Sequence, residues 1–258
     1  MRFCVLGSGS KGNSTYIESG DTGILIDAGF SGIEIERRLT AVGVDISMVS
    51  AILVTHEHTD HIRGVAVLSR RHGLPVYVSS ATRKAANSKF QKLSSCEEFS
   101  PGTSFLLQDI KIHPFSVSHD AADPVGFIVD DGRYRVGYCT DTGMVSRLMC
   151  HRLGGCNGLI LESNHDPLLL KNGPYPPALK QRVRSKDGHL ANHEAVTFLA
   201  DLMHDELNHV ILAHISETNN RLEIVQQTVD ELENPGKISI SLALQDVPGE
   251  MIDLAGAG

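Results

Sequence analysis

The chain has 258 residues, and 41% of them are hydrophobic, which is enough for one large core or two modest ones. We expect a single domain over residues 1–258. The net charge of −8 argues against a protein that grips nucleic acid through a broad basic face, although a nuclease remains open because bound cations supply positive potential locally. The apolar runs are too short to cross a bilayer, and five scattered cysteines without a C-x-x-C pair indicate reduced thiols, so we expect a cytoplasmic protein with no membrane partner.

The first segments alternate between short apolar runs and a glycine-rich loop. Residues 2–6, 15–18 and 23–29 are predicted strands. The loop at 7–14, GSGSKGNS, lacks the G-x-x-x-x-G-K-[ST] spacing of a P-loop and leads into a strand, so binding of a nucleoside triphosphate is disfavoured. Asp27 closes the third strand, where it either holds the neighbouring histidine loop in place or caps the helix predicted over residues 31–42.

The sequence is organised around residues 54–64, VTHEHTDHIRG, which follow a buried strand predicted at 51–54. His56 and His58 lie two residues apart, so in extended backbone their side chains point the same way and can share one metal ion. Asp60 and His61 fall at or just inside the following helix, a turn away from the first pair, which suits a second cation. The pattern therefore predicts a site for two metals.

Beyond this loop, apolar strands alternate with amphipathic helices, which indicates a mixed α/β fold. Three later strands lead into loops that carry a candidate ligand, namely His119, Asp141 and His214, so distant parts of the chain can converge on one sheet edge. Expected helices begin at residue 65 and cover 81–92, 192–206 and 220–233; expected strands cover 76–79, 108–117, 125–129, 133–138, 158–162, 210–213 and 237–244. We expect the tail from about residue 249 to 258 to be flexible.

The motif His-x-His-x-Asp-His after a strand resembles the metal signature of the metallo-β-lactamase superfamily. The resemblance runs to about residue 244 and implies an αββα sandwich, two mixed β-sheets flanked by helices, with a dinuclear centre. An aspartate in the bridging position is similar to superfamily members that hydrolyse phosphodiesters or thioesters, whereas the common β-lactamases place a cysteine there. Carried over by motif, the first metal would be bound by His56, His58 and His119, the second by Asp60, His61 and His214, and Asp141 would bridge them.

A finer resemblance is to the YycJ/WalJ family within this superfamily. It is carried by the loop at 7–14 and by the stretches ESNHD at 162–166, GHLAN at 188–192 and AHIS at 213–216. That family resembles RNase J, RNase Z and Artemis-type nucleases, which implies a 5′-exonuclease that cleaves DNA by metal-activated hydroxide attack. The chain has no room for a β-CASP insert or an RNase Z exosite arm, so short loops must recognise the substrate.

Phosphodiester cleavage also assigns tasks to individual residues. Two cations roughly 4 Å apart can activate a hydroxide and stabilise the leaving oxygen, so Asp60 and Asp141 are expected to act in catalysis through the metals. His165 or His189 would protonate the leaving group or bind phosphate. The candidate substrate-binding residues are Asn164, Ser216 and Asn219, for which a purely structural loop role is the alternative, and Arg182, Arg184 and Lys186, for which it is a solvated helix face. Helical spacing would put Arg182 and Lys186 on one face.

Alternatives to a DNA nuclease remain open at the level of the sequence. A small-molecule hydrolase, such as a cyclic phosphodiesterase or a thioesterase, would use the same ligands, as would a metal-dependent binding or sensing protein. RNA is a second candidate polymer, and the oligomeric state is left open. Imidazole and carboxylate ligands without a thiolate suit two zinc or manganese ions and also accommodate iron.

Overall fold

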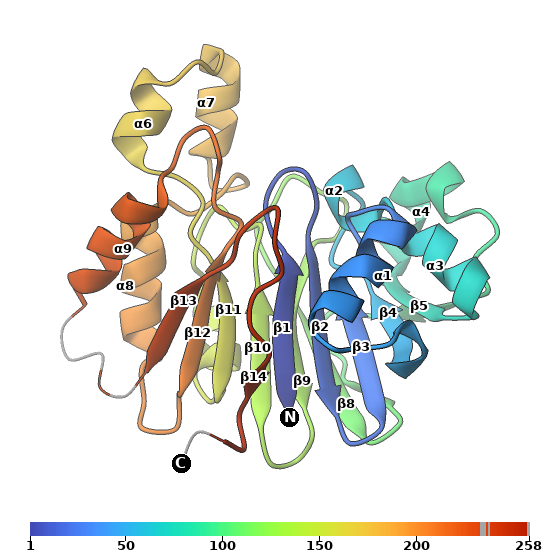
Figure 1. Ribbon diagram of the computed structural model, residues 1–258. Helices are drawn as coiled ribbons and strands as arrows, with labels where there is room; N and C mark the ends of the chain where they lie inside the picture. The colour runs from blue at the N-terminus through green and yellow to red at the C-terminus, as the bar shows by residue number, and fades with distance from the viewer. Residues whose placement is uncertain (233–235, 237, 257–258) are drawn as a thin grey trace.

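The computed structural model describes residues 1–232, 236 and 238–256. Two seven-stranded sheets pack face to face, and helices cover both outer faces (Figure 1). A cluster that includes Phe3, Ile24, Phe127 and Ile211 fills the space between the sheets. The αββα sandwich expected from the sequence is therefore confirmed.

The first sheet is antiparallel from β14 to β3 and parallel from β3 to β6. In spatial order its strands are β14 (Ile252–Asp253), β1 (Arg2–Gly7), β2 (Ser14–Ser19), β3 (Thr22–Ile26), β4 (Val49–Leu53), β5 (Pro75–Ser79) and β6 (Ser95–Phe99). The helices on this side of the sandwich are α1 (Gly32–Ala41), α2 (Thr59–Ile62), α3 (Val65–His72) and α4 (Ser80–Ala86), with short 3-10 turns at Ile46–Met48 and Asn87–Phe90. Ile35 and Leu39 of α1 pack with Leu68 of α3 in a second core against this sheet.

The second sheet is antiparallel from β7 to β10 and parallel from β10 to β13. Its strands, in spatial order, are β13 (Ser239–Leu242), β12 (His209–Ala213), β11 (Gly158–Glu162), β10 (Arg135–Cys139), β9 (Val125–Asp130), β8 (Ile110–Ser116) and β7 (Phe105–Leu107). A third core joins this sheet to α5 (Arg147–Leu153), α8 (Asn192–Leu202) and α9 (Leu222–Asp230). The remaining helices, α6 (Pro167–Asn172) and α7 (Pro177–Val183), form an arm that projects above the strand ends in Figure 1.

Strand direction determines where polar side chains collect. Strands β3 and β4 are parallel neighbours, as are β10, β11 and β12, so within each sheet their carboxyl ends share one edge. These strands are almost wholly buried and apolar, and each gives way to a polar residue where the chain leaves the core. The chain thereby brings its candidate ligands to the same end of the sandwich.

Several expected element boundaries were wrong. The helix predicted over 81–92 ends at Ala86, because Asn87 adopts φ 40° and a 3-10 turn follows. The helix predicted over 192–206 ends at Leu202, where Met203 turns to extended backbone. The predicted elements at 220–233 and 237–244 correspond to α9 and β13, while Glu233 and Lys237 themselves lie outside the described residues.

Part of the tail that we expect to be flexible forms a strand. Asp253 pairs with Arg2 and Ile252 with Phe3, so the tail adds an edge strand to the first sheet. Leu254 is 2% exposed within the core between the sheets, and this apolar burial fixes the segment. Residues 257–258 lie outside the described part of the chain. Among the described residues, none of the helices has the length and apolar character needed to cross a bilayer.

Candidate metal centre and adjoining cavities

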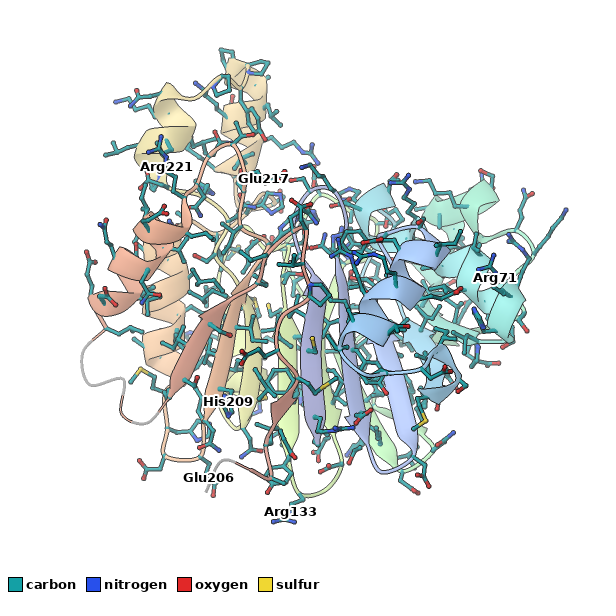
Figure 2. The ribbon with its side chains drawn as sticks, viewed as in Figure 1. Arg71, Arg133, Glu206, His209, Glu217 and Arg221 are labelled. Carbon is teal, nitrogen blue, oxygen red and sulfur yellow. The ribbon has the colours of Figure 1, made fainter. Side chains whose placement is uncertain are left out.

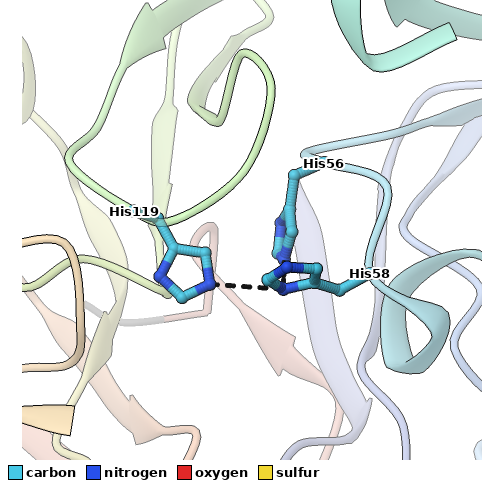
Figure 3. Close-up of side chains that lie close together, drawn as sticks. All are labelled: His56, His58 and His119. Atoms are coloured by element: carbon cyan, nitrogen blue, oxygen red, sulfur yellow. Dashed lines mark hydrogen bonds between the residues drawn. The ribbon is translucent and has the colours of Figure 1, made fainter. Parts of the chain in front are cut away.

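Three histidines from two loops form one cluster. His56 and His58 come from the loop after β4, and His119 comes from the loop after β8 (Figure 3). His58 Nδ1 lies 3.1 Å from His56 Nε2 and 3.4 Å from His119 Nε2. One ligand atom from each of the three residues lies within 4.8 Å of the others, which is the convergence that a shared metal ion requires.

A second cluster lies beside the first. One ligand atom each from Asp60, His61 and His214 meets the same 4.8 Å limit. Asp141 stands between the two clusters, with Oδ2 3.4 Å from His61 Nε2 and Oδ1 3.8 Å from His119 Nε2. The seven residues assigned as metal ligands by motif are thus brought together, and the carboxylate of Asp141 is within reach of both clusters.

The donor atoms of this centre fit divalent cations. Asp141 Oδ2 and His214 Nε2 are buried and have no hydrogen-bond partner in the protein. Leaving buried polar atoms unpaired costs free energy, and coordination would satisfy both. Imidazole nitrogens and carboxylate oxygens without thiolate are ligands for zinc, manganese or iron. The residues present therefore fit a divalent metal centre.

Asp27 holds the histidine loop in place through hydrogen bonds to Thr55 and His61. Its Oδ2 lies 2.7 Å from His61 Nδ1, and its Oδ1 accepts a hydrogen bond of 2.8 Å from the backbone N–H of Thr55. The carboxylate thereby orients the imidazole with its opposite nitrogen toward Asp141. Burial alone would lower the pKa of His61, but Asp141 and Asp27 raise it. The alternative capping role is wrong, because Ser31 caps α1 with its own side chain.

Glu162, which was not predicted from the sequence, holds His189 and His214 in place on the other side of the metal centre. This fully buried carboxylate at the end of β11 accepts hydrogen bonds of 2.8 Å from both His189 Nδ1 and His214 Nδ1. It also accepts from the backbone N–H groups of Asp141, Thr142 and Leu190. Burial opposes ionisation, but the two histidines lower the pKa of Glu162 below its usual range. An acid at the end of an apolar strand, the feature that drew attention to Asp27, was the available signal.

Three residues of the site have left-handed backbone conformation. The φ angles are 60° at Asp27, 56° at Asp141 and 57° at His214. Each residue follows its strand by one or two positions. The left-handed backbone conformation changes the direction of the chain there, so that the side chain faces the metal centre. Such conformations are costly for residues other than glycine and are concentrated at functional sites.

The two candidate acids differ in placement. The ring of His189 lies between those of His119 and His214, with centroids 5.1 and 5.0 Å away, and it lines the cavity at the metal centre. His165 is 2% exposed, lines neither of the two cavities at the site, and its pKa is lowered to about 4 by burial. The geometry therefore favours His189 as the residue that meets a substrate.

Two adjoining cavities open at the site. The first, of about 340 Å³, is bordered by residues of both ligand clusters, by Ser10, and by Arg182 and His189. The second, of about 140 Å³, lies under the α6–α7 arm and shares Ser10, Arg182 and His189 with the first. Asn164, Ser216 and Asn219 all line this second cavity.

The predicted basic groove is only partly assembled. Arg182 lines both cavities and pairs with Asp120. Arg184 and Lys186 are exposed and line neither cavity. Helix α7 ends at Val183, so the expected helical face shared by Arg182 and Lys186 is wrong. The chain turns there because His189 N–H bonds back to the carbonyl of Val183 and Gly188 packs under the arm.

Comparisons with known proteins agree with this geometry. Residues 22–215 match the model of the β-lactamase superfamily domain. The chain is 39% identical to exodeoxyribonuclease YycJ of Bacillus anthracis over 90% of its length and 89% of that protein. The chain belongs to the YycJ/WalJ family. It is 37% identical to exodeoxyribonuclease WalJ of Streptococcus pneumoniae, with 89% of this chain and 87% of that protein covered. The metallo-β-lactamase fold protein YhfI from Bacillus subtilis superposes with a TM-score of 0.72 at 16% identity, covering 96% and 98% of the two chains, and shares the fold of this family member.

Proposed function

We propose that this protein is a metal-dependent exodeoxyribonuclease that removes nucleotides from the 5′ end of DNA with two divalent cations, zinc or manganese. The observation that carries the proposal is the convergence of seven ligand residues beside a small cavity, in a chain 37–39% identical to exodeoxyribonucleases over about nine-tenths of its length. A cavity of this size beside the centre favours a strand end over the middle of a polymer.

The chain offers two sets of ligands for these cations. His56, His58 and His119 would hold one ion, and Asp60, His61 and His214 the other, with Asp141 serving both. When bound, the cations would lower the pKa of a water molecule and neutralise charge on the phosphodiester. Asp27 and Glu162 keep His61 and His214 oriented through their Nδ1 atoms, so that the metal-facing nitrogens need no rearrangement.

His189 is positioned to complete the reaction. Its Nδ1 is engaged by Glu162, which leaves Nε2 for a substrate at the junction of the two cavities. A proton held on Nε2 would pass to the 3′ oxygen of the departing nucleotide as the phosphorus–oxygen bond breaks.

The α6–α7 arm supplies local positive charge in an acidic chain. Between Pro167 and Lys186 the sequence carries five lysines and arginines and no carboxylate, although the net charge of the whole chain is −8. Arg182 reaches the cavities from this arm, so a backbone phosphate can replace Asp120 as its partner. Phosphate contacts of this kind make binding dependent on salt.

The test compares four substrates with purified, metal-analysed protein: 5′-phosphorylated DNA, RNA of the same sequence, bis-p-nitrophenyl phosphate and a glutathione thioester. Release of mononucleotides from the 5′ end of DNA is expected to be the fastest reaction. Faster turnover of either small substrate, or of RNA, would contradict the proposal and favour the small-molecule or RNA alternative.

A second test measures how DNA affinity depends on salt in a matched pair of variants. Arg182→Ala should reduce the slope of log affinity for DNA against log salt by about one unit, because one phosphate contact is lost. Arg133→Ala is the control, since Arg133 lies in the β9–β10 turn at the opposite end of the sandwich (Figure 2). An equal slope in wild type and Arg182→Ala would remove Arg182 from the DNA contacts.

A further inference from the structure

The cavity under the α6–α7 arm, named the arm cavity, is lined by residues that have no task in phosphodiester hydrolysis. It measures about 140 Å³ and lies beside the metal centre rather than within it. Pockets for drug-sized ligands typically reach 300–1,000 Å³, so this volume suits one small moiety. Because Ser10, Arg182 and His189 border both cavities, a group in the arm cavity can be continuous with a phosphate at the metals.

The wall contributed by the arm is apolar and aromatic. Tyr175, in the turn between α6 and α7, lines the cavity together with Leu179 and Val183. Leu179, Arg182 and Val183 lie three and four residues apart on α7, so one helical face presents all three to the cavity. A phosphate has no use for such a wall, whereas the flat face of a nucleobase can stack on a tyrosine ring.

A polar residue completes the lining of the cavity. Asn219 is 1% exposed and lines the cavity, with its Oδ1 buried beside Gly173 of the α6–α7 turn. Its backbone N–H is satisfied by Ser216 Oγ, which holds the loop in place.

We propose that the arm cavity binds the nucleoside at the 5′ end of a DNA strand, with its base stacked on Tyr175. This inference rests on the proposed function and names the part of the substrate that the reaction must hold. The 3′ oxygen of that nucleoside then lies toward His189, which borders both cavities. Stacking accepts every base, so the site selects a strand end without reading its sequence.

A cycle of protein and substrate changes tests the proposal. The ligand is a 5′-phosphorylated oligonucleotide with a phosphorothioate at its first linkage to slow cleavage, prepared with a normal or an abasic first nucleotide. Wild-type protein should bind the abasic end about 5-fold to 150-fold more weakly, the range that one base–aromatic stack produces. Tyr175→Ala should bind the two ends about equally, and Tyr175→Phe should restore the preference.

A spectroscopic readout locates the contact. With 2-aminopurine as the first base, binding to wild-type protein should quench its fluorescence by stacking, and Tyr175→Ala should abolish the quenching. Tyr134→Ala is the control, because Tyr134 lies next to Arg133 in the β9–β10 turn, far from the arm. With 2-aminopurine at the fifth position, the variants should respond alike.

The outcomes separate the two proposals. If wild-type protein degrades DNA but discriminates against the abasic end as strongly in Tyr175→Ala as in wild type, the arm cavity is not the nucleoside site and the proposed function stands. If wild-type protein neither binds nor shortens DNA, both proposals are overturned. Loss of the abasic discrimination in Tyr175→Ala alone supports both.

Discussion

Replacing Glu162 by glutamine should damage the protein even in the absence of metal. Oε1 accepts hydrogen bonds from His189, His214 and the backbone of Asp141, and Oε2 accepts from the backbone of Thr142 and Leu190. The glutamine amide group can donate but not accept, so whichever position it takes, at least two buried donors lose their acceptor. Hydrogen bonds to charged groups contribute about 1.5–3 kcal/mol each, which predicts a loss of roughly 3–6 kcal/mol.

This loss is large against the 5–15 kcal/mol that typically stabilises a folded protein. Urea unfolding of the variant in chelator measures it directly, with Glu206→Gln as the control because Glu206 is exposed at the opposite end of the sandwich (Figure 2). Metal affinity, measured by competition with a fluorescent chelator, should fall about 10-fold to 100-fold, because His214 loses its orienting partner. A Glu162→Gln protein that is within about 0.5 kcal/mol of wild type would refute the role of this carboxylate as a structural centre.

Three further predictions concern single side chains. Asp141→Asn should abolish hydrolysis and weaken binding of both metals while the fold is retained, since asparagine tolerates the left-handed φ of 56°; near-normal turnover with two metals bound would contradict the bridging assignment. Gly29→Ala should unfold the metal loop, because a Cβ there would lie 1.6 Å from the carbonyl oxygen of Asp60, and circular dichroism and metal content report the result. Hydrogen bonding from Arg37 lowers the pKa of Glu34 to about 2, so the stability difference between wild type and Glu34→Gln should be full above pH 4.5 and vanish as the pH falls toward 2; a difference independent of pH would exclude the interaction.

Sequence patterns were informative where one local rule decided the structure. Apolar runs such as 51–54 became buried strands, and the two-residue spacing of His56 and His58 placed both rings in one cluster. Strands β8, β10 and β12 run in the same direction and carry His119, Asp141 and His214 to the same end of the sandwich, which the alternation of strands along the chain could suggest.

The features that the sequence did not predict have a different cause, because each depends on contacts between segments that are distant in the sequence. Glu162 becomes a centre only because β10, β11 and β12 lie side by side and bring three loops to its carboxylate. Lys186 was placed on a helix that ends three residues earlier, where His189 bonds back to Val183. The segment at 252–253 has little strand character by itself and is ordered by the exposed edge of β1. Spacing along a sequence does not contain this information.

The pairing of β14 with β1 makes one strand depend on residues that are synthesised about 250 positions later. During translation β1 can pair with β2 early, but the part of its other edge at Arg2 and Phe3 stays unpaired until residues 252 and 253 emerge. An uncovered strand edge is a template for association with other chains. A ribosome that stalls late, or a nonsense codon shortly before residue 252, would therefore release a protein whose metal-binding residues are all present but whose first sheet is open to aggregation.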